Sequence, residues 1–226
     1  MVILSSFYNE EYLLPWWLEH HKGMFDHGIL FNHFSDDRSA EIVKEICPTW
    51  EVRDTELKDW DFEDFGEEYM DAEREIDGYK MILTTTEFLM SAPELPEEPT
   101  SFAIPMIRMA DNEPDRRPTH DKPLVEQKHF GFADRGVNRY RFLHNYPDGG
   151  YGLGIHKTKH KTTKSPNWIY KYVFSPWTEE FIERKLQMVK YMSVRDKKLK
   201  RAKHHFWDRD ELDRRHKRAV ERSSNI

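Results

Sequence analysis

The chain has few cysteines, glycines and prolines, and it lacks long hydrophobic runs. Its 226 residues include 10 glycines, 12 prolines and a single cysteine, Cys47. One cysteine cannot form an internal disulfide, which favours a reducing compartment, so we expect a cytoplasmic protein. The N-terminal apolar run is interrupted at Ser5, and no run approaches the roughly 20 residues that cross a bilayer. We therefore expect no transmembrane helix. Because no basic residue precedes the apolar run that starts at Val2, we also expect no secretory signal.

The composition is that of a folded domain, with 38% hydrophobic, 14% aromatic and 34% charged residues. This balance excludes disordered and fibrous proteins. The net charge of −6 is unevenly distributed, because residues 195–226 hold 12 Lys and Arg against 6 Asp and Glu, leaving 23 against 35 in residues 1–194. The acidic body argues against a nucleic-acid partner, since phosphate backbones are bound by Lys and Arg.

Apolar runs alternate with segments of helical spacing in the first 92 residues. Helices are expected at 12–21, 40–46 and 67–76, and strands at 2–7, 28–32, 50–53 and 81–83. This alternation predicts an α/β fold with a mostly parallel, Rossmann-like twisted sheet flanked by helices. Ligands bind such sheets beyond the carboxyl ends of the strands, so we expect the polar loops at Asn9, 32–37 and 84–87 to converge.

The pattern changes after the proline-rich segment at 93–99. It predicts strands at 102–109, 127–132 and 139–144, a hairpin around the turn at 147–150, and a helix at 178–192. We therefore expect one domain over 1–192, with a nucleotide-binding half (1–92), a smaller acceptor-side sheet (93–192) and a basic helical tail (193–226).

Several motifs occur in an order known from one enzyme family. An aromatic-rich segment follows the first strand, a serine- and aspartate-containing loop follows the second, and a Glu-Phe-Leu sequence lies further on; these are residues 7–21, 32–39 and 83–89. Over about residues 2–192 the chain resembles the nucleotide-sugar-dependent glycosyltransferases of the GT-A fold, specifically the family 2-like group. The resemblance implies transfer of a sugar from a nucleoside diphosphate sugar to a hydroxyl of a glycan or lipid-linked acceptor, with inversion, as in polysaccharide biosynthesis.

The chain departs from the family at the metal-binding motif. The Asp-x-Asp of the family is replaced by Thr84-Thr85-Thr86, and only Glu87 is retained. Threonine hydroxyls are poor ligands for Mn²⁺ or Mg²⁺, which prefer carboxylates. The resemblance leaves Glu87 and His156 as the candidate metal ligands. Alternatively, a basic loop could compensate the diphosphate charge in place of a metal, or this loop is only a solvated surface; its lysines are Lys157, Lys159, Lys161 and Lys164.

The resemblance also assigns residues to the donor and the acceptor. For the acid–base step we take Asp111 and Glu113, in a loop on the acceptor side. The candidate nucleotide-binding residues are Asn9, Glu10, Asn32 (where the family has Asp), Asp37, Thr86 and Lys157. For Asn9 and Asp37 the alternative is a structural role, because polar residues at strand ends are also common as loop and helix-capping residues.

Aromatic residues and the tail offer further candidates. Trp16 and Trp17 lie on a helix with leucines, which favours the core. Trp60, Phe62 and Phe65 lie in an acidic stretch and are candidates for exposed, sugar-facing rings. The basic tail is either a solvated helix with i, i+4 ion pairs or a peripheral contact with anionic lipid.

Two function hypotheses follow from these motifs. The first is an active glycosyltransferase, and the second is a silent relative that binds a nucleotide sugar or a glycan without turnover. The loss of both aspartates at Thr84 and Thr86 motivates the second.

Overall fold

A mixed β-sheet runs through the molecule, which a computed structural model describes over residues 1–133 and 140–226. Its main strand order is β11-β7-β6-β8-β4-β1-β2-β3. The first half is parallel: β1 lies between β2 and β4, and β2 pairs with β3. These four strands are β1 (Val2–Phe7), β2 (His27–Asn32), β3 (Glu51–Asp54) and β4 (Lys80–Ile82).

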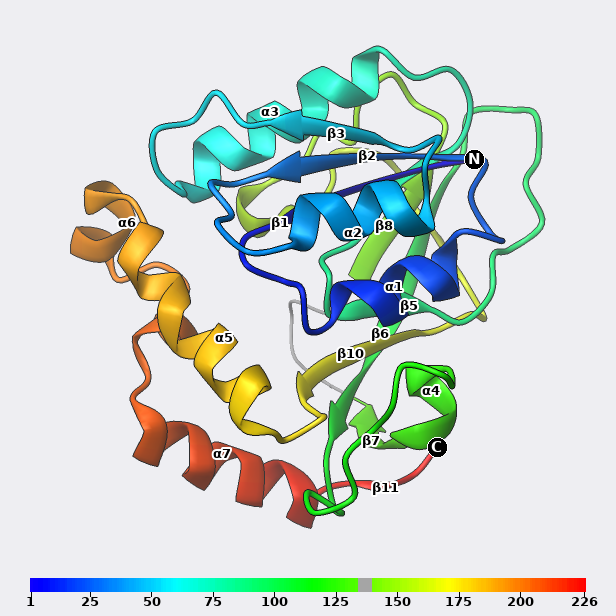
Figure 1. Ribbon diagram of the computed structural model, residues 1–226. Coiled ribbons are helices and arrows are strands. Elements are labelled where there is room, and N and C mark those ends of the chain that lie inside the picture. The colour runs from blue at the N-terminus through cyan, green and yellow to red at the C-terminus, as the bar shows by residue number, and fades with distance from the viewer. Residues whose placement is uncertain (134–139) are drawn as a thin grey trace.

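Helices cover both faces of this parallel half (Figure 1). On one face, α1 (Leu14–His21) and α2 (Ser39–Ile46) pack against Ile3 of β1. On the other, α3 (Phe62–Arg74) packs against Leu4. Successive strand residues thus face opposite helices, as the alternation in a strand requires. The predicted α/β architecture is confirmed.

The second half of the sheet is built around the long strand β6 (Ser101–Ala110). It pairs antiparallel with β7 and β8 and parallel with β9 and β10. The remaining elements of this half are α4 (Leu124–Gln127), β5 (Glu87–Leu89), β7 (Phe130–Ala133), β8 (Tyr140–His144), β9 (Thr163–Lys164) and β10 (Ile169–Phe174).

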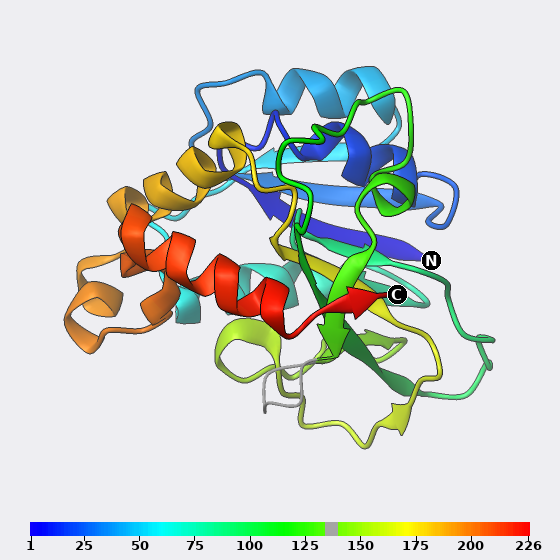
Figure 2. The same ribbon diagram turned by 90° about the horizontal axis from the view of Figure 1, so that it is seen from below.

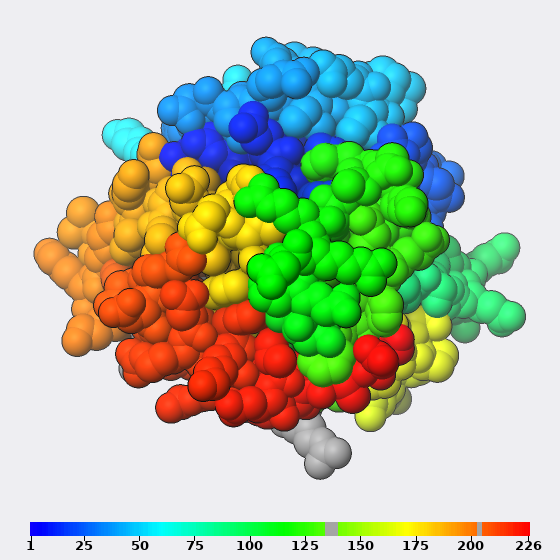
Figure 3. Space-filling view, turned by 60° about the horizontal axis from the view of Figure 1, so that its bottom comes forward, coloured from blue at the N-terminus to red at the C-terminus, as the bar shows by residue number. Residues whose placement is uncertain are grey.

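The chain ends in α5 (Glu179–Tyr191), α6 (Val194–Leu199), α7 (Arg209–Glu221) and β11 (Ser224–Asn225). Helix α5 begins where predicted, because the Thr178 hydroxyl accepts a hydrogen bond from the Phe181 N–H. Helices α5 and α6 lie beyond the carboxyl ends of β1 to β3 (Figure 1). The chain then turns back, and β11 pairs with β7 (Figure 2). Residues after 193 therefore pack against the domain, and they form a continuous surface with the segment before β7 (Figure 3).

Some sequence-based boundaries were wrong. Helix α3 begins at Phe62 rather than 67, because the Asp61 side chain caps it by accepting from Glu63 N. Residues 127–129 end a short helix instead of starting a strand. The expected hairpin around 147–150 is absent from the described residues: Tyr151 bridges to Thr158, and a 3₁₀ turn follows at Leu153–Ile155. Arg139, expected in a strand, lies outside the described residues.

None of the helices in the described parts of the chain combines the length and the apolar character that a bilayer crossing needs.

Candidate functional site

A cavity of about 600 Å³ opens at the carboxyl ends of β1, β2 and β4. The polar loops after these three strands converge on it as predicted, since Glu10, His33 and Thr86 all contribute to its lining. The opposite side is formed by β6, β8, β10, α5 and residues 201–212. We call the lining residues numbered 6–86 the N-terminal wall and those numbered 106–212 the C-terminal wall.

The two walls differ in charge. Among the described residues the N-terminal wall contains no Lys or Arg and one carboxylate, Glu10, whereas the C-terminal wall contains no carboxylate. An anionic ligand therefore finds its partners on one side of the cavity, although residues 1–194 are acidic overall. The six cationic residues of the C-terminal wall are Arg108, Arg141, Lys171, Arg184, Lys185 and Arg201.

Glu87 lies behind the C-terminal wall and holds two of its cations. The guanidinium of Arg141 donates two hydrogen bonds to the fully buried carboxylate, at 2.8 and 2.9 Å, and Lys171 Nζ donates a third at 2.8 Å. Thr84 N–H donates a fourth, at 2.9 Å. Burial acts to raise the pKa of the Glu87 carboxyl, but the charges of Arg141 and Lys171 hold it well below its usual range.

These contacts do not fit a divalent metal site. Both Glu87 oxygens accept hydrogen bonds from cations, and His156 Nδ1 faces Arg141 Nη1 at 2.8 Å. A metal ion here would be repelled by Arg141 and Lys171. Among the residues that the structure describes, no three His, Cys, Asp or Glu gather in a way that could hold a metal. The contacts of Glu87 and His156 therefore count against the expected Mn²⁺ or Mg²⁺ site at these two residues.

His156 is an uncharged member of the C-terminal wall. Burial and the nearby charges of Arg141 and Lys171 lower the pKa of its imidazole to about 3. At neutral pH it is therefore a neutral hydrogen-bonding group inside a cationic environment.

Glu10 connects the two walls. Its carboxylate forms an ion pair with Arg184 of α5, and its N–H donates to Ser39 Oγ at 2.8 Å. Burial raises the pKa of the Glu10 carboxyl above its ordinary value, with Arg184 opposing the rise. Arg184 also donates to the Thr85 hydroxyl at 3.3 Å, so this pair ties α5 to the loops after β1 and β4.

The three threonines of residues 84–86 form part of the cavity lining. The hydroxyls of Thr84 and Thr86 lie 3.1 Å apart and hydrogen-bond to each other. This part of the lining is neutral, so the positive charge across the cavity is not cancelled. Of the predicted nucleotide-binding residues, Glu10 and Thr86 line the cavity.

Asn9, Asn32 and Asp37 hold loops instead of lining the main cavity. Asn9 exchanges two hydrogen bonds with Asp36, at 2.6 and 3.0 Å. Asn32 Nδ2 donates to Asp54 at 2.9 Å. The Asp37 carboxylate accepts from the N–H groups of residues 11 and 39, at 3.0 and 2.9 Å. Asn9 and Asp37 border a second cavity, on the side of α2, and their hydrogen bonds favour the alternative that they are loop residues.

Asp111 and Glu113 lie outside both cavities. Asp111 is buried, and its carboxylate accepts from Lys128 Nζ at 2.8 Å, Glu113 N at 3.0 Å and Trp177 N at 2.9 Å. Three of the roughly four acceptor positions of this buried carboxylate are therefore occupied by protein groups. These contacts, which join the loop after β6 to the start of α5, favour a structural role for Asp111 over the expected acid–base role.

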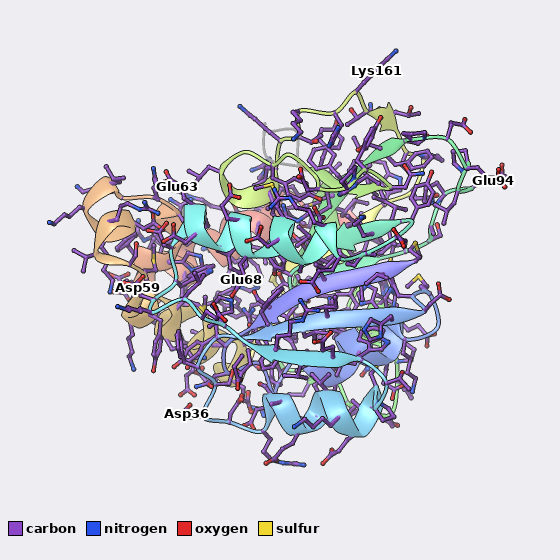
Figure 4. The ribbon with its side chains drawn as sticks, turned by 90° about the horizontal axis from the view of Figure 1, so that it is seen from above. Asp36, Asp59, Glu63, Glu68, Glu94 and Lys161 are labelled. Atoms are coloured by element: carbon purple, nitrogen blue, oxygen red, sulfur yellow. The ribbon has the colours of Figure 1, made fainter. Side chains whose placement is uncertain are left out.

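The basic loop after residue 156 also lies away from the cavity lining. Lys157 is exposed and lines neither cavity, and Lys159 pairs with Asp148. Figure 4 shows Lys161 pointing away from the molecule, on the side opposite to Asp36. The cations of the cavity come from β6, β8, β10, α5 and Arg201, where no local sequence motif marks them.

Aromatic rings make up much of the N-terminal wall. Trp60, Phe62 and Phe65 line the cavity; Phe65 is buried, whereas Trp60 and Phe62 are half-buried. Phe34 lines it as well and is 45% exposed. Trp17 is fully buried in the core, as expected.

Comparison with known proteins gives a likeness in fold only. No family model matches the chain, and no curated protein sequence matches it. A crystal structure of S. aureus TarS 1-349 aligns with a TM-score of 0.46 and 11% identity, over 84% of this chain and 64% of that one. A second S. aureus TarS structure aligns at 0.44 and 12%, over 84% of this chain and 39% of that one. The chain spans less than two thirds of either TarS chain, and likeness at this level says nothing of substrate or activity.

Proposed function

We propose that the chain is a glycosyltransferase that binds a nucleoside diphosphate sugar without a divalent metal. The observation that carries this proposal is the division of one cavity into an aromatic, nearly uncharged wall and a cationic wall. A nucleotide sugar has the same division, since its base and sugar are neutral rings and its diphosphate is anionic. Rings stack on aromatic side chains, and Lys and Arg bind phosphate oxygens. The sequence resemblance supports the same substrate class.

In the proposed reaction, an acceptor hydroxyl attacks the anomeric carbon of the donor sugar. The bond from this carbon to the acceptor oxygen forms, the bond to the diphosphate oxygen breaks, and the nucleoside diphosphate leaves with the electron pair. Cations stabilise the charge that develops on the leaving group. Glu10 is the one carboxylate in the described lining, so it is the candidate to take the acceptor proton.

A catalytically silent, ligand-binding relative is the second candidate. It is favoured by the ion pair between Glu10 and Arg184, because a carboxylate held by a guanidinium is less accessible to the proton of an acceptor hydroxyl. Both candidates bind the same ligand, and only turnover separates them.

The test is a thermal-shift screen with a panel of nucleoside diphosphates and nucleotide sugars, each with EDTA or with Mn²⁺. A ligand that binds the folded state raises the melting temperature. We expect one nucleotide to stabilise the protein equally in EDTA and in Mn²⁺. Stabilisation that requires Mn²⁺ would contradict metal-independent binding, and no stabilisation by any nucleotide would contradict the function. Release of nucleoside diphosphate with an acceptor then separates the enzyme from the silent relative.

We also propose that α6 contacts an anionic membrane surface next to the cavity. Val194 and Leu199 are 63% and 57% exposed, and lysines flank them at 197, 198 and 200. Arg201, two residues after Leu199, lines the cavity, so such a contact would bring a lipid-linked acceptor close to it. Co-sedimentation with phosphatidylserine vesicles should be lost in V194S/L199S, and unchanged sedimentation would refute the contact.

A further inference from the structure

Lys185 is a cation of the C-terminal wall that differs from its neighbours. It lies in the middle of α5 and lines the cavity. Its ammonium group is next to two aromatic rings, 5.1 Å from the ring centroid of Phe181 and 5.8 Å from that of Phe174. These rings offer weak cation–π contacts but no hydrogen-bond acceptor.

Other cations of this wall have carboxylate partners. Arg141 and Lys171 share Glu87, and Arg184 is paired with Glu10. Arg201 is paired as well, with Glu63 and Asp196.

Lys185 takes part in no hydrogen bond or ion pair with the residues that the structure describes. Lys185 is half-buried, and an unpaired ammonium in such a position is unfavourable unless it loses its proton or gains an anion.

The charged groups that face Lys185 are mostly positive. Arg184 belongs to the same helix, Lys171 to β10 and Arg108 to β6, while Glu10, after β1, is negative. Burial and the charges of Arg184 and Lys171 lower the pKa of Lys185 to about 7. An anion in the cavity would offset this repulsion and favour the protonated form.

We propose that Lys185 binds the diphosphate of the donor where the family uses a divalent metal, and that it takes up a proton from solvent as the ligand binds. This inference rests on the proposed function, because it assigns the diphosphate to the C-terminal wall. The neutral threonines on the N-terminal wall fit it, since they leave no carboxylates that would attract a metal.

The test uses inorganic pyrophosphate and the nucleoside diphosphate found in the thermal-shift screen, with the full chain and isothermal titration calorimetry from pH 6 to 8.5. The variants are Lys185→Met, which is neutral and of similar length, and Lys185→Arg, which stays charged. Lys190→Met is the matched control, because Lys190 is exposed on the same helix. Titrations in two buffers of different ionisation enthalpy measure the protons taken up on binding.

We expect Lys185→Met to weaken binding of both ligands by roughly tenfold or more, as loss of a hydrogen bond to a charged group does. Lys185→Arg should bind at least as tightly as the wild type at pH 8. At pH 7 the wild type should take up roughly half a proton more than Lys185→Arg, because half of the free Lys185 is unprotonated. Without ligand, Lys185→Met should melt at a higher temperature, since it removes an unpaired, half-buried charge.

The outcomes separate the two proposals. If the nucleoside diphosphate binds the wild type and Lys185→Met equally, with equal proton uptake in Lys185→Arg, the role of Lys185 is refuted and the proposed function stands. If pyrophosphate binding depends on Lys185 but no nucleotide binds, the anion site stands and the proposed function is refuted. If Lys185→Met does not fold, the proton uptake of Lys185→Arg alone decides.

Discussion

The two walls of the cavity were assembled in different ways. The N-terminal wall consists of loops that follow parallel strands, and it presents aromatic rings and threonine hydroxyls. The C-terminal wall consists of side chains from strands, from α5 and from residues 153–156 and 201–212, and it presents six Lys and Arg. The first wall is preformed by the strand order, whereas the second depends on buried charges that must be balanced. The first therefore suits recognition of rings, and the second suits binding of an anion.

The largest expected effect is the loss of stability in Glu87→Gln, which removes the negative charge that compensates the cations of the C-terminal wall. Glutamine keeps the shape of the side chain, but it leaves Arg141 and Lys171 without a counter-charge in a buried position. Breaking such a pair costs about 3–5 kcal/mol of the free energy of unfolding. Urea denaturation measures this loss, with the exposed Glu94→Gln as the control. A loss below about 1 kcal/mol would mean that Glu87 does not hold this wall together.

The same wall predicts a loss of stability in mild acid. In the folded protein the pKa of His156 is lowered to about 3, and in the unfolded chain it is about 6.5. Below pH 6.5 the unfolded chain takes up a proton that the folded protein excludes, so the free energy of unfolding falls as the pH falls. For this histidine the fall between pH 7.5 and 5.0 should be about 2 kcal/mol.

The measurement is urea denaturation at both pH values, in the wild type and in His156→Gln. The variant should lose less stability on acidification, while His20 and His21, whose pKa values are also lowered by burial, keep part of the slope. An equal fall in both proteins would show that the cations around His156 do not control its protonation.

The N-terminal wall is probed by Phe34→Asn. Phe34 has a positive φ of 62° and is 45% exposed, so its ring contributes little to the core. Asparagine tolerates this backbone conformation, and stability should not fall. We expect nucleoside diphosphate binding to weaken about tenfold through lost stacking, while pyrophosphate binding stays unchanged. Phe206→Asn is the control, since Phe206 is similarly exposed outside the lining. Equal losses for both ligands would remove the distinction between the walls.

The N-terminal half of the fold was predictable because its signals are local. Apolar runs and helical spacing marked β1, β2, α1 and α2, and the rule for parallel strands brought their loops together. The hairpin prediction around residues 147–150 was wrong because this segment makes a long-range contact: Gly149 N–H donates a hydrogen bond to Glu73, which lies 76 residues earlier. A contact over such a distance has no local signature.

The C-terminal wall could not be predicted for the same reason. Arg141 and Glu87 are 54 residues apart, and neither reveals its partner in the sequence. Lys185 is one of several charged residues on an amphipathic helix, and only the packing of α5 shows which of them enters the cavity. The basic loop at 157–164 had the more obvious composition, but Lys157 is exposed away from the lining.

Asp37→Ala should have the smallest effect on binding, and it tests whether proximity to a strand end is enough to make a nucleotide-binding residue. The Asp37 carboxylate accepts two backbone hydrogen bonds, from residues 11 and 39, and it lies on the second cavity. Its loss should cost about 1 kcal/mol of stability and leave nucleoside diphosphate affinity unchanged in calorimetry. A matched variant, Glu45→Ala, borders the same cavity and accepts no backbone hydrogen bond in the described structure, so it should change neither quantity. Weaker nucleotide binding in Asp37→Ala alone would move the base toward the second cavity and away from the aromatic wall.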